Sequence, residues 1–394
     1  MKQGNNIIGV EYCCGCGGCA QKCPAHCISI EQDEDGFWKA KCDEAKCVHC
    51  GKCLKVCPMK HDSQVDSGTP ECYAAVTCNK EYERRSSSGG AFSQIAQKVL
   101  DHNGTVWGCG MNSELLPSHM PIRTIDKLDI LRRSKYVQSF LGNSYSLIEK
   151  SLEDGGQVLF AGTPCQVGGL KKFLGKQYDN LFLIDLVCHG VPSPGMFMKH
   201  IQYLEKKKGQ KISSFEFRLK NDQPNKHYCY TCLFASGKTE TGVYYKDVFF
   251  NEFYDMTSLN ECCYHCPYAN KERQGDLTIG DFGWGKQYHP ELKDHGEISC
   301  ILVNTEKGKA MLDSIRPEMY CYPTKWEYII EKNGNLLHPT GRPGYRSHIY
   351  KEIREKGYEK WAENYYHSMR YLKKLPIMRP LVKAKIFLNR LKQK

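Results

Sequence analysis

The chain has 394 residues, a net charge of +11 and 23 cysteines, and no run of apolar residues is long enough to span a bilayer. This length is enough for two or three domains, and the first residues lack the apolar core of a signal peptide, so we expect a cytoplasmic protein. In a reducing compartment so many cysteines indicate metal binding rather than disulfides. Positive charge attracts anionic partners, but we find no nucleic-acid-binding module and expect no nucleic acid as a ligand.

Residues 1–62 contain one cysteine pattern twice, C-x2-C-x2-C-x3-C followed by proline. This spacing is typical of bacterial ferredoxins with two 4Fe-4S clusters, in which the last cysteine of each copy binds the cluster of the other copy. We therefore predict two clusters, one bound by Cys13, Cys16, Cys19 and Cys57 and the other by Cys47, Cys50, Cys53 and Cys23. Paired zinc sites are the alternative, but zinc needs four ligands per site and leaves the third cysteine of each copy unexplained.

Five other cysteines and histidines of this domain fall outside the pattern, and we interpret them as packing, surface or near-cluster residues: Cys14, Cys27, Cys42, His26 and His49. A polar segment with turn residues, 63–72, is predicted to link the domain to the rest of the chain.

Beyond the linker, strands and helices alternate. In residues 73–150 we predict a strand at 73–77, a serine–glycine loop at 84–90, a helix at 91–100 and a strand at 105–110. For the part ending at residue 345 we predict a helix at 142–153, buried strands at 157–161 and 181–187, a helix from 167, antiparallel strands at 215–219, 227–235 and 238–245, and short strands at 277–280 and 299–304. The fold class is α+β, a dicluster ferredoxin domain followed by an α/β body with mixed sheets and with its sites on strand-end loops.

The loop Ser86, Ser87, Ser88, Gly89 and Gly90 precedes the helix at 91–100. A helix N-terminus offers free N–H groups and the positive end of a dipole, glycines allow close approach, and serines add hydroxyl donors. This combination suits the phosphate of a flavin nucleotide, with Arg84 and Arg85 as further charges. A flexible serine loop that caps a helix is an equal alternative.

Four more cysteines follow predicted strands or form a C-x2-C pair: Cys165, Cys188, Cys263 and Cys266. Together they give the ligand count for a third 4Fe-4S cluster. The alternative is scattered buried cysteines plus one zinc-like pair. We exclude the pair Cys229 and Cys232, because residues three apart in a strand point to opposite faces, and we prefer Cys263 to its neighbour Cys262 because of the spacing to Cys266.

The chain resembles the coenzyme F420 hydrogenase/dehydrogenase β-subunit family with a dicluster ferredoxin domain at its N-terminus. The resemblance rests on the motifs at 86–90, 134–139 (SKYVQS), 162–167 (GTPCQV), 185–192 (DLVCHGVP), 263–266 (CYHC) and 276–282 (DLTIGDF). It departs from the family at Gly283, an extra residue before Trp284, which puts the roles of Asp281 and Trp284 in question.

The resemblance implies a flavoprotein with FAD or FMN near a 4Fe-4S cluster, and bacterial relatives of this layout often belong to surface polysaccharide synthesis. It implies cofactor-binding roles for Ser86, Ser87, Ser88, Gly89, Gly90, Lys135, Tyr136, Gln166 and Asp281, and the third cluster for Cys165, Cys188, Cys263 and Cys266. Among these, Lys135 is our candidate charge near the flavin or substrate, and His189 our candidate proton donor, with shaping of the cluster loop as its alternative role.

We therefore expect an oxidoreductase that takes electrons from a ferredoxin-like donor through 4Fe-4S clusters to a flavin and then to a small-molecule or lipid-linked substrate. The alternative is an electron-transfer subunit that docks on a partner enzyme and has no substrate of its own. A third, weaker hypothesis is an iron–sulfur scaffold protein in a glycan assembly complex.

Residues 346–394 are predicted to form a basic helical tail. From Tyr365 to Lys394 the sequence has nine Lys or Arg and no acidic residue, and one helical face carries Leu381, Ala384, Leu388 and Leu391. Such a helix can lie on an anionic membrane surface, so peripheral contact with the inner face of the membrane is a further expectation. Packing of this helix against the protein body is the alternative.

Overall fold

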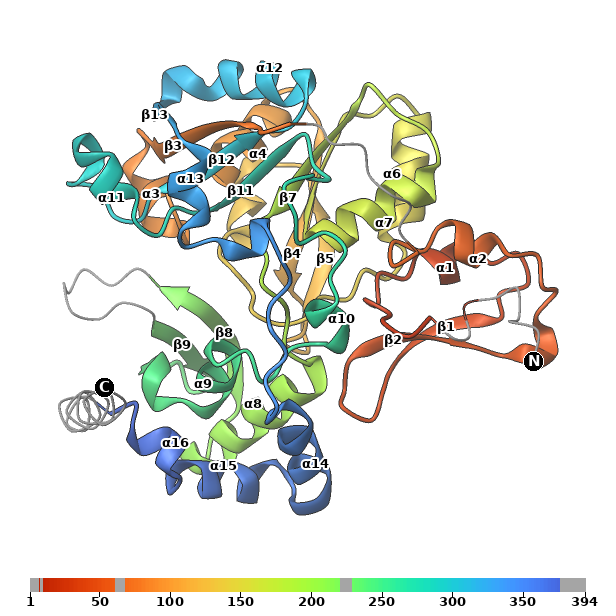
Figure 1. The fold of residues 1–394 in the computed structure, drawn as a ribbon, viewed down its shortest axis with the longest axis vertical. Coiled ribbons are helices and arrows are strands. Elements are labelled where there is room, and N and C mark those ends of the chain that lie inside the picture. The colour runs from red at the N-terminus through yellow and green to blue at the C-terminus, as the bar shows by residue number, and fades with distance from the viewer. Residues whose placement is uncertain (1–6, 8–9, 61–67, 220–228, 376–394) are drawn as a thin grey trace, which may run out of the picture.

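The N-terminal domain consists of an antiparallel hairpin and two single-turn helices (Figure 1). The computed structural model describes residue 7 and residues 10–60, 68–219 and 229–375. The elements of this domain are α1 (Gly18–Gln21), β1 (Ile28–Gln32), β2 (Trp38–Cys42), a 3-10 helix (Glu44–Lys46) and α2 (Lys52–Lys55). Gly17 and Gly51 precede α1 and α2 with φ angles of 74° and 71°, so the repeat in the cysteine spacing is also present in the backbone.

One eight-stranded sheet organises the body, with the strand order β13-β3-β12-β11-β7-β6-β4-β5. Its strands are β3 (Glu71–Thr77), β4 (Thr105–Met111), β5 (Pro117–Ile122), β6 (Val158–Gly162), β7 (Leu181–Leu186), β11 (Leu277–Asp281), β12 (Ser299–Val303) and β13 (Met319–Thr324). The central strands β4, β6, β7 and β11 are parallel, and all other pairs are antiparallel. This sheet confirms the predicted mixed architecture, the predicted strand at 105–110 and the predicted buried strands at 157–161 and 181–187.

Helices cover both faces of this sheet (Figure 1). Leu159 of β6 faces a core that includes residues of α4 (Ala91–Asp101) and α12 (Glu306–Ile315), and its neighbour Phe160 faces a core that includes residues of α6 (Ser144–Glu153) and α7 (Pro164–Leu174). Successive strand residues point to opposite faces, so the unbroken apolar run of β6 is buried on both sides.

A second lobe, below the sheet in Figure 1, is built around aromatic side chains. It contains α8 (Pro194–Lys208), β8 (Ile212–Leu219), β9 (Cys229–Phe234), β10 (Thr239–Val243), α9 (Val248–Tyr254), α14 (Arg346–Lys356), α15 (Tyr358–Tyr366) and α16 (Met369–Leu372). β10, β9 and β8 form an antiparallel sheet, and Gly237, with a φ of 83°, makes the predicted turn between β9 and β10. Phe197, Phe217 and Phe250 are among its fully buried side chains.

The remaining elements are short and lie at the edges of the two lobes. They are α3 (Lys80–Arg85), α5 (Leu128–Leu131), α10 (Glu261–Tyr264), α11 (Gly285–Tyr288), α13 (Trp326–Ile330) and 3-10 helices at Ile125–Lys127, Tyr244–Lys246, Pro290–Leu292, Arg316–Glu318 and Gly334–Leu336. Within the described ranges, no helix combines the length and the apolar character needed to cross a bilayer.

The structure differs from several of the predicted element boundaries. β3 begins at Glu71, inside the predicted linker 63–72. Strands from residues 73–150 and from residues 151–345, which we predicted as two parts of one domain, share one sheet. Arg84 and Arg85 end α3 instead of opening a loop. α7 begins at Pro164, three residues before the prediction, because Thr163 and Gln166 form a capping box around it.

The structure describes the predicted tail, 346–394, as far as residue 375. Its first part, α14 to α15, packs in the second lobe through Ile349, Ile353 and Trp361, so this part is not detached. The apolar positions of the expected membrane helix, Leu381 to Leu391, lie outside the described residues.

The N-terminal domain is fixed to the body at both of its ends. At the hairpin tip, the Asp35 carboxylate accepts a hydrogen bond from Arg346 at 3.0 Å and pairs with Arg354, and its carbonyl accepts one from Ser193 at 2.6 Å. At the other end, Lys22 and Glu149 form an ion pair of 2.8 Å. Side chains from α14, α6 and the loop before α8 thus hold a domain that precedes all of them in sequence.

Candidate functional site

The thiols of the first predicted cluster lie together at the junction of the N-terminal domain with the body. Burial raises the pKa of Cys19, and the neighbouring thiols of Cys13 and Cys57 raise it further. A hydrogen bond with Cys14 lowers the pKa of Cys16, but burial and the thiols of Cys19 and Cys13 outweigh it and leave that pKa raised. Cys57 is far from the other three in sequence, and its place beside them is the crossing expected for a two-cluster ferredoxin.

The second predicted set is closer to solvent. Cys23 and Cys53 are buried and Cys47 is half-buried, but Cys50 is exposed. The structure also brings two thiols outside the pattern to this set. The sulfurs of Cys27, Cys42 and Cys47 lie within 4.8 Å of one another, and Cys27 Sγ is 3.4 Å from Cys23 Sγ.

Both sets share one backbone feature around their first cysteine. The N–H of Gly15 donates to Cys13 Sγ at 3.4 Å, and the N–H of His49 donates to Cys47 Sγ at 3.4 Å. Hydrogen bonds to cluster sulfurs favour the thiolate and raise the reduction potential of a bound cluster. The two copies of the pattern therefore supply the same polar support to their first ligand.

The four body cysteines come from three separate places and meet at one wall of a pocket. Cys165 lies in the first turn of α7, Cys188 follows β7, and Cys263 and Cys266 lie in and after α10. Burial raises the pKa of Cys188 well above its ordinary value, and the thiols of Cys263, Cys165 and Cys266 add to this effect. Four thiols gathered in this way fit the ligand set of a third 4Fe-4S cluster.

Two adjacent cysteines have different roles at this wall. The pKa of Cys263 is lowered, first of all by a hydrogen bond from the thiol of Cys262. Cys262 itself is buried, and the same contact raises its pKa well above the ordinary value. A metal ligand must be a thiolate, and Cys263 stays our predicted ligand.

Cys14 joins the two regions, which the sequence pattern gave no reason to expect. Its thiol is hydrogen-bonded to Cys16 of the N-terminal domain and to Cys165 of the body. Cys16 Sγ also lies next to α7, 3.3 Å from the position that a Cβ on Gly169 would occupy. The first and third predicted ligand sets are therefore separated by one side chain.

A buried ion pair fixes the loops that carry the body cysteines. Arg273 Nη2 donates to Asp185 Oδ1 at 3.2 Å and to the carbonyl of Leu186 at 3.1 Å, and Arg273 Nη1 donates to the carbonyl of Tyr268 at 3.0 Å. The side chains of Arg273 and Asp185 are 2% and 0% exposed. Asp185 lies in β7 shortly before Cys188, and Tyr268 follows Cys266. The ion pair therefore fixes the segment that carries Cys188 relative to the segment that carries Cys266.

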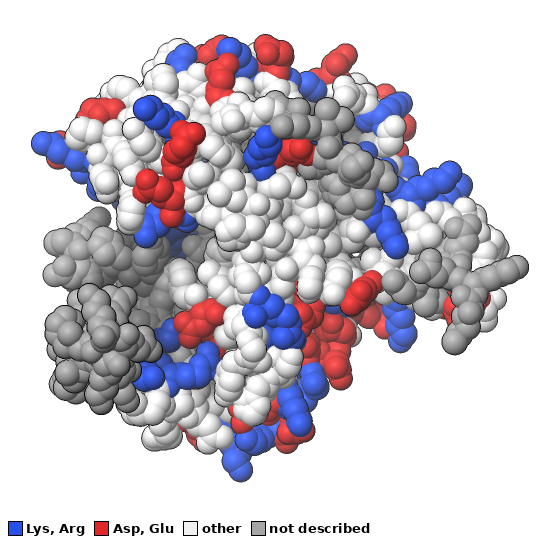
Figure 2. Space-filling model, viewed as in Figure 1, with Lys and Arg blue, Asp and Glu red and all other residues white. Residues whose placement is uncertain are grey.

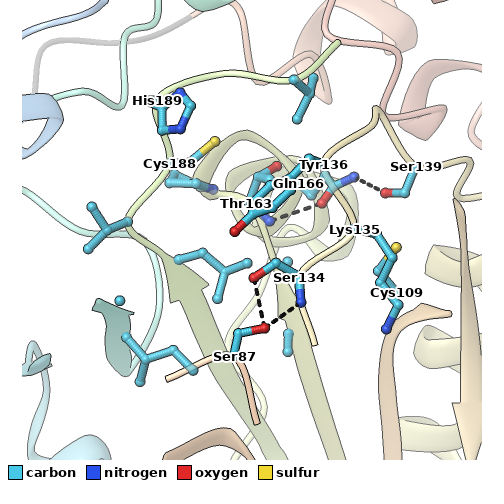
Figure 3. Close-up of a pocket in the computed structure, with 18 of the residues that line it drawn as sticks. Ser87, Cys109, Ser134, Lys135, Tyr136, Ser139, Thr163, Gln166, Cys188 and His189 are labelled. Carbon is cyan, nitrogen blue, oxygen red and sulfur yellow. Dashed lines mark hydrogen bonds between the residues drawn. The ribbon is translucent and has the colours of Figure 1, made fainter. Parts of the chain in front are cut away.

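The pocket has a volume of about 460 Å³ and lies between the eight-stranded sheet and the second lobe (Figure 3). It is lined by the loops at 86–93, 131–139, 161–166, 186–191 and 279–281, by α9 residues and by all four body cysteines. The parallel strands β6, β7 and β11 end at this pocket. The sites predicted on strand-end loops are therefore brought into one cavity.

The serine–glycine loop forms the part of the pocket that leads into α4. Gly90, with a φ of 90°, precedes the helix, and Ala91, Phe92 and Ser93 of its first turn line the cavity. The loop is held by its own hydroxyls: Ser88 Oγ donates to the carbonyl of Ile298 at 3.0 Å, and Ser87 Oγ accepts from the N–H of Ser134 at 2.8 Å (Figure 3). The loop thus presents helix N–H groups to the pocket in a fixed conformation.

Arg132 supplies a charge beside this loop that the sequence patterns did not single out. It is 6% exposed, donates from Nε to Ser93 Oγ at 3.0 Å, and lies over the ring of Tyr82. Its Nη2 is buried and has no hydrogen-bond partner among the described residues. A phosphate at the start of α4 would satisfy this donor, so the site fits a flavin nucleotide.

Neither of the two arginines expected to help the loop lines the pocket. Arg85 pairs with Glu81 and Asp129, and Arg84 is exposed and does not line the pocket.

Lys135 lies in the pocket beside Cys109 (Figure 3). Its Nζ donates to the carbonyls of Arg132 at 2.5 Å and Ile130 at 3.2 Å. Burial lowers the pKa of Lys135 to about 8. The ammonium group is therefore charged near neutrality and titrates just above it.

Gln166 and His119 belong to one chain of hydrogen bonds in the pocket wall. The Gln166 amide accepts from the N–H of Thr163 at 2.9 Å and donates to Ser139 Oγ at 2.8 Å (Figure 3). Ser139 in turn contacts His119 Nδ1 at 3.1 Å, and burial lowers the pKa of His119 to about 4. Both polar groups of Gln166 are thus engaged in positioning the α7 N-terminus.

Tyr136 and Asp281 meet on the side of the pocket formed by the second lobe. Arg218 Nη1 donates to Asp281 Oδ2 at 2.6 Å and to the hydroxyl of Tyr136 at 3.4 Å. The ring of Tyr136 packs on Phe253 with centroids 4.8 Å apart. Arg218, which was not predicted, therefore connects β8 of the second lobe with β11 of the main sheet.

His189 and Trp284 are residues whose roles the sequence left open. The ring of His189 packs on Phe253, its Nδ1 is buried without a hydrogen-bond partner in the described part of the chain, and burial lowers its pKa to about 4. Trp284 is 42% exposed, lies under Lys332, and does not line the pocket. The excluded pair Cys229 and Cys232 is buried in β9.

Comparisons with known proteins match two separate parts of the chain. Residues 12–61 match the family described as 4Fe-4S dicluster domain. A protein of Porphyra purpurea, described as an uncharacterized protein in the rpl9-rpl11 intergenic region, is 33% identical over 61 residues, which are 14% of this chain and 77% of that protein. A chain of the F420-reducing NiFe hydrogenase complex from Methanosarcina barkeri has a TM-score of 0.44 and 14% identity, covering 77% of this chain and 94% of its own length.

The body, which contains the pocket and the four assembled cysteines, has a match of its own. Residues 155–325 match the family described as the C-terminal part of the coenzyme F420 hydrogenase/dehydrogenase beta subunit. The matched range includes Cys165, Cys188, Cys263 and Cys266, and it excludes the loop at 86–90 and Lys135. This chain is an iron–sulfur electron-transfer protein that is related to the beta subunits of coenzyme F420 hydrogenase/dehydrogenase and carries a 4Fe-4S dicluster domain at its N-terminus.

Proposed function

We propose that the chain is a flavin-dependent oxidoreductase in which the pocket binds FAD or FMN beside a third 4Fe-4S cluster. The observation that carries this proposal is the composition of one cavity, which brings four thiols, a helix N-terminus and the unpartnered Nη2 of Arg132 together. When bound, iron–sulfur clusters supply single electrons and a flavin couples single-electron to two-electron chemistry.

Different residues of the pocket would bind the phosphate and the ring of the flavin. The first turn of α4 and Arg132 would hold the phosphate, because both present N–H donors to the same end of the cavity. Lys135 would place a positive charge near the ring or the substrate, and the Tyr136 ring an apolar surface. Asp281, Gln166 and His189 would shape the cavity, and His189, neutral near pH 7, would hold a hydrogen bond to the substrate.

The substrate in this proposal is a small organic molecule or a lipid-linked intermediate of surface polysaccharide synthesis. The second candidate function is an electron-transfer subunit that docks on a partner enzyme. It differs from the first in requiring no substrate at the pocket.

The test is the cofactor content of protein purified without oxygen. We expect about twelve irons, a matching amount of acid-labile sulfide and one flavin per chain. Arg132→Met should lose the flavin and keep the iron, and Arg84→Met, which changes an exposed arginine outside the pocket, should keep both. About eight irons without flavin would reject the proposal and favour the docking subunit.

A further inference from the structure

The two halves of the N-terminal domain share one sequence pattern but have different surroundings. The half that holds Cys13, Cys16 and Cys19 faces the body, and the Tyr268 hydroxyl donates to the carbonyl of Pro58, next to Cys57, at 2.8 Å. The other half faces solvent: Cys50 is exposed and Val48 is 65% exposed, the highest value among the large exposed apolar residues of the described chain. Among the predicted cluster ligands in the described part of the chain, Cys50 of the second set is therefore the most accessible to another protein.

The repeat shows which positions make the contact with the body. In the first copy, the carbonyl of Cys14 accepts from Gln138 at 2.9 Å, and Gln21 Oε1 accepts from the N–H of Ser146 at 2.9 Å. A Cβ on Gly15 would lie 2.6 Å from Gln138 Nε2, and one on Gly18 would lie 3.5 Å from the ring of Tyr145. These four positions form the docking face of the first copy: Cys14, Gly15, Gly18 and Gln21.

In the second copy, the same four positions are exposed and larger. They are Val48, His49, Lys52 and Lys55, and we call them the α2 face. Lys52 and Lys55 have no ion-pair partner among the described residues, and Lys46 nearby pairs with Asp43 at 3.0 Å. The four positions that contact the body in the first copy are thus exposed in the second copy. There they present one apolar side chain, Val48, and the charges of Lys52 and Lys55, which are unpaired within the described ranges.

The charge around the α2 face is one-sided. Residues 41–60 include five lysines and two acidic residues, Asp43 and Glu44. Figure 2 shows Lys and Arg side chains over the part of the domain that holds α1 and α2. Complementary charge steers the encounter of electron-transfer partners, whose interfaces are small and transient.

We propose that the α2 face docks an acidic single-electron carrier protein of the ferredoxin type. In each encounter the carrier is oxidised by one electron and this chain is reduced by one, and no bond forms or breaks. The inference rests on the proposed function for the direction of this transfer. It does not depend on the pocket, because no residue of the α2 face lines that cavity.

The test measures the affinity of the full-length protein for a small, strongly acidic two-cluster ferredoxin, at low and at physiological salt. We expect Lys52→Glu with Lys55→Glu to weaken binding about tenfold or more at low salt. Val48→Ala should weaken it by a smaller factor, because it removes only apolar contact. The matched control is Lys199→Glu with Lys360→Glu, two exposed helical lysines on α8 and α15, which should leave binding within about twofold of the wild type.

A basic cytochrome c provides the probe of opposite charge, and the Lys52/Lys55 variant should not weaken its binding. The iron content of the Lys52/Lys55 variant is measured first, and the comparison uses protein that keeps its iron. The proposal would be overturned if this variant bound the acidic ferredoxin as tightly as the wild type, or if the Lys199/Lys360 control lost as much affinity. The two proposals can be rejected independently. If the protein lacks flavin but binds ferredoxin through Lys52 and Lys55, the docking proposal is supported and the flavin-dependent oxidoreductase is rejected. If the protein contains flavin but its ferredoxin binding does not depend on these lysines, the oxidoreductase is supported and the docking proposal is rejected.

Discussion

The predicted cluster ligands of the N-terminal domain and those of the body represent two ways to build an iron–sulfur site. The eight cysteines of the repeated pattern lie within 45 residues, from Cys13 to Cys57, and their spacing alone singles them out. The four predicted ligands in the body come from a helix N-terminus, a strand end and a short helix with the residues after it, and a buried ion pair holds these pieces together. A contiguous site needs little beyond its own turns, whereas an assembled site depends on distant groups that bind no metal.

This difference predicts that the assembled site fails first when the ion pair is broken. Arg273→Met leaves the carboxylate of Asp185 buried without its partner, which we expect to cost about 3–5 kcal/mol in the free energy of unfolding. Iron should fall from about twelve to about eight per chain, because only the body cluster depends on this pair. Chemical denaturation and iron analysis measure both effects.

Two substitutions control this experiment. Arg273→Lys keeps the charge and should recover part of the iron. Arg316→Met removes an arginine that is 40% exposed and lies 3.6 Å from Asp313, so it should change stability by less than about 0.5 kcal/mol. If Arg273→Met kept all its iron, the dependence on distant groups would be rejected.

The comparison is sharpened by two cysteines that both lie near Cys165. Cys188→Ala should remove about four irons and leave the two N-terminal clusters, because it deletes one ligand of the assembled set. Cys14→Ala should keep about twelve, although Cys14 is hydrogen-bonded to Cys165. Iron, sulfide and the electron paramagnetic resonance spectrum of the reduced protein distinguish the two. Equal iron loss in both variants would make Cys14 a ligand.

A smaller effect is expected at the turn between the first two cysteines of each copy. Gly15 has a φ of 72° and lies against Trp38 and Gln138, so Gly15→Ala should destabilise the N-terminal domain by about 1–3 kcal/mol. The equivalent residue in the second copy, His49, already has a side chain at a φ of 52° and is exposed. His49→Ala should therefore change the free energy of unfolding by less than about 0.5 kcal/mol. A matching loss in both variants would mean that the body contact is unimportant.

The smallest effect concerns a charge in the assembled region. Because the pKa of Lys135 is about 8, its ammonium is present below that pH and is lost as the pH rises through it. Flavin affinity should therefore weaken between about pH 7 and 9, by up to about tenfold. Lys135→Met should bind less tightly at pH 7 and show no such dependence. Lys332→Met, at the exposed rim of the pocket, should keep the wild-type profile, and a flat wild-type profile would remove Lys135 from the site.

The features that could be predicted from the sequence are those with a local signal. The strands β4, β6 and β7 were predictable because their apolar runs are bounded by turn residues, and α4 because its apolar residues recur at helical spacing. The early start of α7 was also predictable, since Thr163-Pro164-Cys165-Gln166 has the form of a capping box, which places the helix start before residue 167.

Other features carry no local signal. Arg132, Arg218 and Cys14 act through partners that lie far away in sequence, and only the folded sheet brings those partners near. The same holds for the packing of α14 and α15, because a helical periodicity shows that a face is buried without showing what covers it.

The attachment of the N-terminal domain has a consequence for the kinetics of the protein. Asp35 is held by Arg346, Arg354 and Ser193, and the backbones of Gly36 and Gly195 touch, while Lys22 and Gln21 are held by α6 at the other end. A domain fastened at both ends does not swing on a tether. Electron transfer within this chain is therefore set by fixed distances, and its rate should be insensitive to solvent viscosity, while the bimolecular encounter with a carrier slows as viscosity rises.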